Sequence, residues 1–308
     1  MTPTAFLFPG QGSQAPGMLA DLADESVVRQ TFREAADTLG FDLWGLIQNG
    51  PEDELNRTDR TQPALLACSV ALWRLWEERG GARPDWLAGH SLGEYSALVC
   101  ADALSLADGV RLVETRGRFM QEAVPAGQGG MAAILGLDDD EVVRLCGEAA
   151  GDQVVQAVNF NAPGQVVIAG DNEAVDRAID ACKEAGAKRA MALPVSVPSH
   201  CELMKPAAER LRDVLEELSL ASPRIPVVNN VDVAVETEPA AIRDALVRQL
   251  YSPVRWSETV RRLLDEGVEQ SYECGPGKVL AGLVKRVERR APVTPLGDRE
   301  ALDGALAS

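Results

Sequence analysis

Short apolar runs alternate with longer helical patterns along most of the chain. The apolar runs predict strands at Ala5–Phe8, Trp86–Ala88, Val227–Asn229 and Gln270–Glu273. Apolar positions at helical spacing predict helices at Pro63–Arg79, Leu92–Cys100, Leu106–Ala123, Leu203–Leu218, Ala240–Leu250, Ser257–Glu266 and Val279–Arg289, and Ser105 is a predicted N-cap. Strands that alternate with helices in this way are typical of an α/β fold with a mainly parallel sheet covered by helices.

The stretch from about Gly127 to Pro198 has a different pattern. It predicts, in order, a strand, a helix, two strands joined as a hairpin, a helix and a strand, at Gly130–Leu137, Asp139–Ala150, Val154–Asn159, Gln165–Ala169, Glu173–Ala185 and Arg189–Val195. This βαββαβ order is that of a ferredoxin-like unit. Because it begins and ends inside the larger pattern, we expect residues 127–197 to form an inserted subdomain. Residues 1–126 and 198–308 then form the main domain, and a ligand cleft is expected between the two.

Charge, hydropathy and cysteine content limit the kinds of partner and the cell compartment that the sequence predicts. The formal net charge of −17 disfavours nucleic acid and anionic membranes, because both repel an acidic surface. The N-terminal apolar run is too short for a signal peptide, and no stretch approaches the roughly 18 apolar residues of a membrane span. The six cysteines are scattered without a C-x-x-C pair, so we expect buried free thiols in a reducing cytoplasm, and neither disulfides nor a metal site.

Ser91 lies at a predicted junction between a strand and a helix, in Gly89-His90-Ser91-Leu92-Gly93. This spacing of glycines around a serine is that of a nucleophile elbow, in which a strained turn exposes the serine hydroxyl near a helix N-terminus. The elbow favours a main domain of α/β-hydrolase-like architecture. An α/β-hydrolase esterase is therefore one functional alternative, although a third of the chain follows His200, whereas hydrolases usually place their histidine close to the C-terminus.

A serine hydroxyl is a poor nucleophile without a base. The chain has only two histidines, His90 and His200. Because adjacent side chains at a sharp turn point in different directions, we expect His90 to point into the protein, which leaves His200 as the base. With 47 acidic residues, the sequence offers no unique carboxylate to orient this histidine, and a carbonyl group is the alternative.

An oxyanion hole needs two donors aimed at the developing negative charge. The backbone N–H of Leu92 is the first candidate, because it directly follows the nucleophile. The second is expected from the glycine-rich segment Phe8-Pro9-Gly10-Gln11-Gly12-Ser13-Gln14, which follows a predicted strand. The same segment fits a dinucleotide fingerprint through Ala15, but Pro16 and Gly17 fall where that motif requires a helix.

Seven motifs occur together and in order: Phe8-Pro9-Gly10-Gln11-Gly12-Ser13-Gln14, Thr61-Gln62-Pro63-Ala64, Gly89-His90-Ser91-Leu92-Gly93-Glu94-Tyr95, Arg116-Gly117, Asn159-Phe160-Asn161, Pro198-Ser199-His200 and Gly275-Pro276-Gly277. In this combination the chain resembles the bacterial malonyl-CoA:acyl carrier protein transacylases of type II fatty-acid synthesis. The resemblance extends from about Phe6 to Val287. It implies transfer of a malonyl group from malonyl-CoA to the phosphopantetheine thiol of acyl carrier protein, without a cofactor or a metal.

The resemblance also implies roles for individual residues. Ser91 would carry the malonyl group and His200 would act as base and then as acid, oriented by the main-chain carbonyl of Gln249. Gln11 and Leu92 would donate backbone N–H groups to the oxyanion. Substrate-binding positions in the matching motifs are Arg116, Gln62 and Asn161, and Arg116 would bind the malonyl carboxylate. A planar guanidinium suits this task, because it can donate two parallel hydrogen bonds to a carboxylate.

Two groups of basic residues are candidates for contacts with the substrates. Lys188 and Arg189, at the rim of the predicted insertion, are candidates for the phosphates of CoA. A second group is a candidate docking patch for an acidic carrier protein or, alternatively, a solvated helix face: Lys278, Lys285, Arg286, Arg289 and Arg290. We expect a monomer. A free-standing acyltransferase of a polyketide synthase is the alternative within this class: Pro198-Ser199-His200 resembles the fatty-acid enzyme, but no motif identifies the carrier protein. A non-catalytic synthase subunit is a further alternative.

Overall fold

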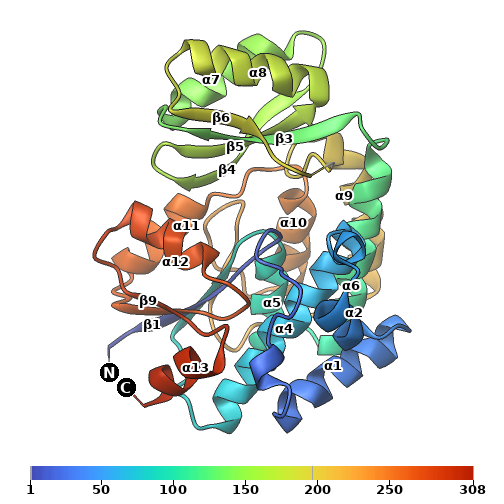
Figure 1. Cartoon of the computed structure of the whole chain (residues 1–308), viewed down its shortest axis with the longest axis vertical. Helices are drawn as coiled ribbons and strands as arrows, with labels where there is room; N and C mark the ends of the chain where they lie inside the picture. The colour runs from blue at the N-terminus through green and yellow to red at the C-terminus, as the bar shows by residue number, and fades with distance from the viewer. Residues whose placement is uncertain (1, 196, 308) are drawn as a thin grey trace.

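Parallel strands form the larger of two sheets in the computed structural model, which describes residues 2–195 and 197–307 (Figure 1). The strand order is β7 (Val227–Val228), β2 (Trp86–Gly89), β1 (Thr4–Phe8), β8 (Gln270–Glu273) and β9 (Val293–Pro295), and all four pairings are parallel. The predicted parallel sheet is therefore confirmed. Strand β9 is not among the predicted strands, because Val293-Thr294-Pro295 contains no apolar run and ends in proline.

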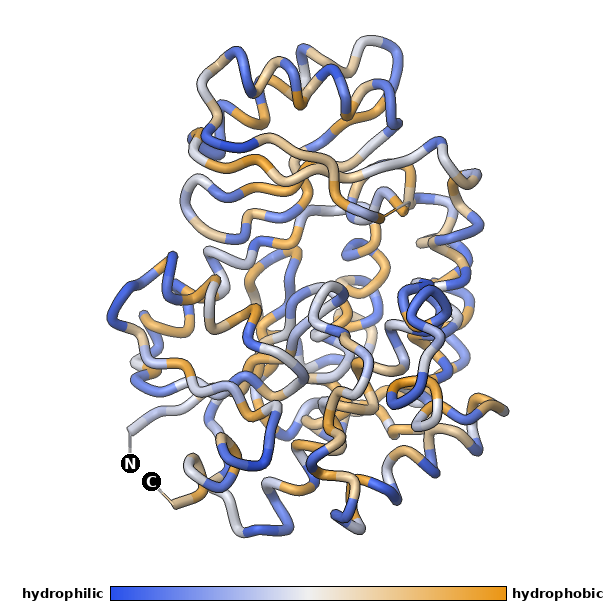
Figure 2. Tube along the Cα trace, in the orientation of Figure 1, coloured by the Kyte–Doolittle hydropathy of each residue, from blue (hydrophilic) through white to orange (hydrophobic). Residues whose placement is uncertain are grey.

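Helices cover both faces of this sheet, as its continuous apolar strands require. They are α1 (Ser26–Leu39), α2 (Leu43–Asn49), α3 (Glu52–Leu55), α4 (Thr58–Glu78), α5 (Leu92–Cys100), α6 (Leu106–Ala123), α9 (Lys205–Glu217), α10 (Pro239–Gln249), α11 (Trp256–Asp265), α12 (Val279–Val287) and α13 (Arg299–Leu306), with 3-10 turns η1 (Ala20–Leu22) and η2 (Glu202–Met204). Phe6 and Phe8 of β1 belong to the core that includes α4, α5 and α6, whereas Ala5 and Leu7 pack with α11 and α12. Figure 2 shows hydrophobic stretches along the strands and hydrophilic stretches on outer helical turns.

The smaller sheet is antiparallel and has its own core. Its elements are β3 (Gly129–Leu135), α7 (Asp139–Ala150), β4 (Val155–Ala162), β5 (Gln165–Asp171), α8 (Asn172–Glu184) and β6 (Arg189–Ala192), in the sheet order β4-β5-β3-β6. Ile134 and Ile168 pack under α7 and α8, while Met131 and Val167 belong to a separate cluster on the other face. The predicted ferredoxin-like βαββαβ unit is confirmed. In Figure 1 its helices lie at the top, and β4 faces the larger unit.

The two units meet along β4. The backbone N–H of Val254 donates to Val158 O at 2.8 Å, and the N–H of Phe160 donates to Val254 O at 3.0 Å. We propose the domain boundaries at 126/127 and 197/198, just outside β3 and β6.

Some element boundaries differ from the prediction. Helix α4 begins at Thr58, more than one turn before Pro63, so Pro63 is inside the helix and does not start it. The Thr61 hydroxyl bonds the carbonyl oxygens of Leu55 and Arg57 at 2.6 and 3.0 Å, and this buried first turn outweighs the missing N–H of proline. Strand β7 ends before Asn229. The N-cap at Ser105 is confirmed, since its Oγ accepts from the Asp108 N–H at 3.0 Å.

Helices α1, α2, α3 and α13 were not among the predicted elements. Helix α1 buries Val28, Phe32 and Ala35 at helical spacing, so its pattern is readable, whereas α3 spans only four residues. All six cysteines are free and buried. Within residues 2–195 and 197–307, none of the helices is long and apolar enough to span a bilayer.

Candidate active site

Ser91 occupies a strained turn between β2 and α5. Its φ of 53° and ψ of −110° lie outside the usual regions for a residue with a side chain. A Cβ on Gly89 would lie 1.9 Å from the carbonyl carbon of Gly93, and a Cβ on Gly93 would lie 1.9 Å from the carbonyl oxygen of Phe8. Both glycines are therefore required by close backbone approach, and the strand–turn–helix context of the predicted elbow is confirmed.

His200 contacts Ser91 on one side and Gln249 on the other. Its Nε2 lies 2.7 Å from Ser91 Oγ, and its Nδ1 lies 2.7 Å from the main-chain oxygen of Gln249. Because a carbonyl can only accept, Nδ1 carries the proton and Nε2 is free to accept the serine proton. Burial and the nearby charge of Arg116 lower the pKa of His200 to about 3. The imidazole is therefore neutral near pH 7, the state a general base needs.

Gln11 and Leu92 lie at the same edge of the sheet. Strands β1 and β2 are parallel neighbours with Phe8 opposite Gly89, so the segments after both strands meet beside Ser91. Leu92 is the first residue of α5, where a backbone N–H has no acceptor in its own helix. Both residues line the cavity around Ser91, as expected for oxyanion donors.

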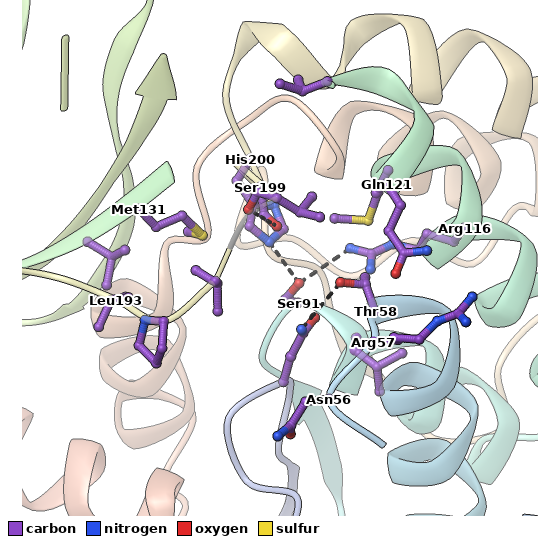
Figure 3. Close-up of a pocket in the computed structure, with 18 of the residues that line it drawn as sticks. Asn56, Arg57, Thr58, Ser91, Arg116, Gln121, Met131, Leu193, Ser199 and His200 are labelled. Carbon is purple, nitrogen blue, oxygen red and sulfur yellow. Dashed lines mark hydrogen bonds between the residues drawn. The ribbon is translucent and has the colours of Figure 1, made fainter. Parts of the chain in front are cut away.

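Arg116 is buried and is held by neutral oxygen atoms. Its guanidinium donates to Gln62 Oε1 at 2.7 Å and to Gln249 Oε1 at 3.0 Å. It also donates to Ser91 Oγ at 3.3 Å (Figure 3). It also lies over the ring of Tyr95, 5.1 Å from the centroid. In the described part of the chain, Arg116 forms no ion pair with a carboxylate. A buried cation without an anionic partner is costly, and a substrate carboxylate would relieve that cost.

The cavity beside Ser91 has a volume of about 670 Å³ and walls from both units. The main unit contributes Gln11, Thr58 and Met120, while the small unit contributes Met131 and Val167. Its size and mixed polar and apolar lining are those of a small-molecule site. The expected cleft between the two units is thus present, with Ser91 and His200 in its wall (Figure 3). Within the two described ranges, no group of His, Cys, Asp and Glu side chains could hold a metal ion.

His90 and Asn161 contact each other beside the cavity. His90 Nε2 lies 2.7 Å from Asn161 Oδ1, and the imidazole packs against Trp256 with centroids 5.5 Å apart. The His90 ring thus contacts Asn161 and buried Trp256, in line with its predicted inward orientation, but the residue is half-buried and also lines the cavity. The substrate-binding role expected of Asn161 stays a prediction: its Oδ1 contacts His90, and its neighbour Asn159 is among the residues that line the cavity. Gln62 is not among the residues that line the cavity; its Oε1 accepts a hydrogen bond from Arg116.

The basic candidates lie on the surface and are not among the residues that line the cavity. Lys188 and Arg189 are exposed at the outer end of β6, where Arg189 pairs with Leu135. The chain then runs from β6 into Leu193, which lines the cavity. The second group, which we call the α12 patch, is exposed on and beside α12 and consists of Lys278, Lys285, Arg286, Arg289 and Arg290.

Two polar residues of the site were missed. Asn230 Oδ1 accepts from the Ser91 N–H at 2.7 Å, and buried Glu94 accepts from the Gln249 amide at 2.8 Å. Asn230 follows β7, whose carboxyl end lies beside that of β2, so a polar residue after the apolar pair Val227-Val228 was a usable signal. Glu94 is within the elbow motif, but its burial depends on tertiary contacts.

The chain is similar along most of its length to known acyl transferases. A family model described as the acyl transferase domain matches residues 5–295. A curated malonyl CoA-acyl carrier protein transacylase of Salmonella typhimurium is 61% identical over 307 residues, covering 99% of each chain. The chain belongs to the malonyl-CoA:acyl carrier protein transacylases. This confirms the family resemblance stated from the motifs.

Other transacylases support this membership. The transacylase of Bacillus subtilis is 48% identical, covering 99% of this chain and 97% of its own. A solved acyl carrier protein S-malonyltransferase of Vibrio cholerae has a TM-score of 0.96 at 58% identity, covering 98% of this chain and 99% of its own. A solved malonyl-transacylase in complex with its type II PKS acyl carrier protein has a TM-score of 0.98 at 59% identity, covering 99% of each chain.

Proposed function

We propose that this transacylase transfers the malonyl group of malonyl-CoA to the phosphopantetheine thiol of acyl carrier protein, through an ester on Ser91, in fatty-acid synthesis. The observation that carries the proposal is the buried Arg116 guanidinium, 3.3 Å from the Oγ of a serine that is itself 2.7 Å from a neutral histidine. In malonyl the carboxylate is separated from the reacting carbonyl by one methylene. A cation this close to the nucleophile therefore suits a short acyl group with a terminal carboxylate.

In the first half-reaction, Ser91 Oγ attacks the thioester carbonyl while His200 Nε2 accepts the serine proton. Negative charge develops on the carbonyl oxygen, where the N–H groups of Gln11 and Leu92 are our candidate donors. The tetrahedral intermediate breaks its C–S bond, and His200 returns the proton to the departing CoA sulfur. Gln249 O holds the Nδ1–H throughout, so the imidazole keeps one tautomer.

In the second half-reaction, the carrier thiol gives its proton to His200 and its sulfur attacks the malonyl ester. Collapse of the intermediate breaks the C–O bond and returns the proton to Ser91. Water must be excluded while the ester waits, and the cavity between two units supports that exclusion. All the groups in this scheme come from one chain, which is compatible with the monomer we propose.

A two-step mass experiment tests the proposed function. The protein is incubated with malonyl-CoA, acetyl-CoA or a simple ester, and intact mass shows which acyl adduct forms. Acyl carrier protein is then added. We expect a malonyl adduct that persists until the carrier is added and then moves to it. Rapid hydrolysis without the carrier would support the esterase instead, and absence of any adduct would support a non-catalytic subunit.

The two basic surfaces should act on different half-reactions. The α12 patch forms none of the ion pairs found in the described part of the chain, and one of its members reaches the small unit, since Arg286 donates to Gln165 Oε1 at 2.6 Å. On a chain of charge −17, such a patch suits an acidic carrier. Lys188 and Arg189 suit the phosphates of CoA, which lie far from its thiol.

Charge removal separates these two roles. We expect alanine substitutions in the α12 patch to raise the KM for the carrier by about tenfold at low salt and to leave the KM for malonyl-CoA unchanged. Alanine substitutions at Lys188 and Arg189 should raise the KM for malonyl-CoA and leave the KM for the carrier unchanged. Steady-state kinetics with each substrate varied in turn gives both values. If each set of substitutions changed both KM values equally, the assignment of separate surfaces would be wrong.

A polyketide carrier is the second candidate partner. The observation in its favour is the likeness, at a TM-score of 0.98, to a malonyl-transacylase in complex with a type II PKS acyl carrier protein. Comparing kcat/KM for a fatty-acid carrier and a polyketide carrier decides between the two. We also propose a cytoplasmic location, which the six free cysteines support because thiols stay reduced there; recovery of the protein from a periplasmic fraction would contradict it.

A further inference from the structure

Side-chain amides bind both polar groups of the Ser91 backbone. The Ser91 N–H donates to Asn230 Oδ1 at 2.7 Å, and the Ser91 carbonyl accepts from Gln249 Nε2 at 3.0 Å. Asn230 also donates through Nδ2 to Gly89 O at 2.7 Å. A residue with a φ of 53° keeps that conformation only when its surroundings fix it. These two amides supply such contacts.

One oxygen of Glu94 connects the two amide-bearing residues. Glu94 Oε2 accepts from the backbone N–H of Asn230 at 2.9 Å and from Gln249 Nε2 at 2.8 Å. The side chain is only 3% exposed, so solvent cannot easily replace it. Without this acceptor, the Asn230 N–H would lose its partner and the Gln249 NH₂ would keep only the Ser91 carbonyl, at buried positions where lost hydrogen bonds are expensive.

Glu94 also determines which way the Gln249 amide faces. Because a carboxylate only accepts, the NH₂ group of Gln249 turns toward Glu94, and Oε1 is left to accept from Arg116 Nη2 at 3.0 Å. If the Gln249 amide were flipped, its NH₂ group would face the guanidinium, and two donors cannot form a hydrogen bond with each other. The direction of Arg116, whose Nη2 reaches Ser91 Oγ, therefore depends on Glu94 through one intermediate residue.

We propose that Glu94 is a positioning residue for malonyl transfer, which fixes the Gln249 amide and through it the Ser91 backbone and the Arg116 guanidinium. The inference rests on the proposed function, since it concerns the same acyl-serine. Glu94 touches neither the substrate nor the reacting atoms in this arrangement. Its effect should be seen in the rate of Ser91 acylation and in the preference for malonyl over acetyl groups.

The ionisation of Glu94 gives this role a pH signature. Burial raises the pKa of Glu94 to about 7, while its bonds from Gln249 and Asn230 and the charge of Arg116 oppose the rise. The other acids that face it are Asp232, which favours the protonated form, and Glu236, which lines a small pocket together with Glu94. Protonation weakens the acceptor, so acylation should decline as the pH falls below about 7. His200, with a pKa of about 3, stays neutral over that range.

Two substitutions separate the acceptor from the charge. Glu94→Gln keeps an acceptor oxygen and removes the ionisation, whereas Glu94→Leu removes both. A matched control is Glu273→Leu, because Glu273 is also buried and accepts two backbone N–H groups, from Leu280 at 2.9 Å and Ala281 at 2.8 Å, without contacting the site. Acylation of Ser91 by malonyl-CoA and by acetyl-CoA is followed by intact mass between pH 5.5 and about 8.5, with melting temperatures measured alongside.

We expect Glu94→Leu to slow malonylation by about 100-fold and to reduce the malonyl-to-acetyl preference, with kcat changing more than KM. Glu94→Gln should retain malonylation to within about tenfold and lose the decline below pH 7. Glu273→Leu should lower the melting temperature and leave the acylation rate of the folded protein unchanged.

Three results would overturn the inference: malonylation by folded Glu94→Leu at a rate close to that of the wild type, an equal loss in Glu273→Leu, or a decline below pH 7 that persists in Glu94→Gln. If Glu94→Leu does not fold, the pH profile of Glu94→Gln still decides. Absence of a malonyl adduct on the wild-type protein would instead refute the proposed function.

Discussion

Ser91→Ala is expected to abolish the malonyl adduct and to reduce transfer to the carrier by about 10⁴-fold or more. The physical reason is that Ser91 Oγ is the hydroxyl that His200 Nε2 contacts, at 2.7 Å, and it also lies within reach of Arg116. Alanine removes the attacking atom and leaves the fold of the elbow unchanged. Intact mass after incubation with malonyl-CoA measures the adduct directly.

Ser199 provides a control for the identity of the nucleophile. It directly precedes His200 and its hydroxyl lies 3.5 Å from the carbonyl oxygen of Val197, the acceptor it would use in place of a base. We expect Ser199→Ala to form the malonyl adduct. An adduct that survived in Ser91→Ala but disappeared in Ser199→Ala would transfer the role of nucleophile to Ser199 and overturn the mechanism.

The second large effect is expected from Arg116→Ala, which should lower malonylation of Ser91 by about 10²- to 10³-fold. Acetylation should be retained or increase. An acetyl group leaves the buried guanidinium without an anionic partner, at a cost of about 3 kcal/mol, and the substitution removes that cost. It also removes the positive charge that lowers the pKa of His200, so the base becomes stronger.

Two further variants make this result specific. Arg111→Ala, on the same helix but with a side chain 62% exposed, should leave both acylation rates unchanged. Arg116→Lys keeps the positive charge but loses the planar guanidinium, which can donate two parallel hydrogen bonds. We expect its malonylation rate to lie between those of Arg116→Ala and the wild type. Intact mass with malonyl-CoA and acetyl-CoA gives the ratio of rates. Equal loss of both acyl groups in Arg116→Ala would contradict a carboxylate-binding role.

Local pattern was sufficient to predict much of the fold. The small unit has a simple alternation of elements, and α7 spans Asp139–Ala150 as predicted. The start of α4 was more difficult to predict from the sequence. The Thr61 hydroxyl in its first turn bonds the carbonyl oxygens of Leu55 and Arg57, and helix propensity contains no information about such a contact. Proline at position 63 is a start signal by itself, and tertiary burial overrode it.

The catalytic residues of the site could be predicted where their chemistry is distinctive and their residue type is rare in the chain. With only two histidines in the chain, elimination led to His200 as base, although its approach to Ser91 joins positions 109 residues apart. The family resemblance supplied the Gln249 carbonyl, which no residue type reveals because every residue has one. Asn230 and Glu94 were missed because their importance comes from the hydrogen bonds they share with Ser91 and Gln249, which only the folded chain shows.

The six buried cysteines have a consequence for a reaction in which an acyl group passes from one thiol to another. Burial raises the pKa of Cys201, directly beside His200 in sequence, to about 12, and that of Cys146 to about 12 as well. A thiol that stays protonated is a poor acyl acceptor. None of the six cysteines is among the residues that line the cavity, so the protein itself offers no reactive thiol to the malonyl-serine that we propose.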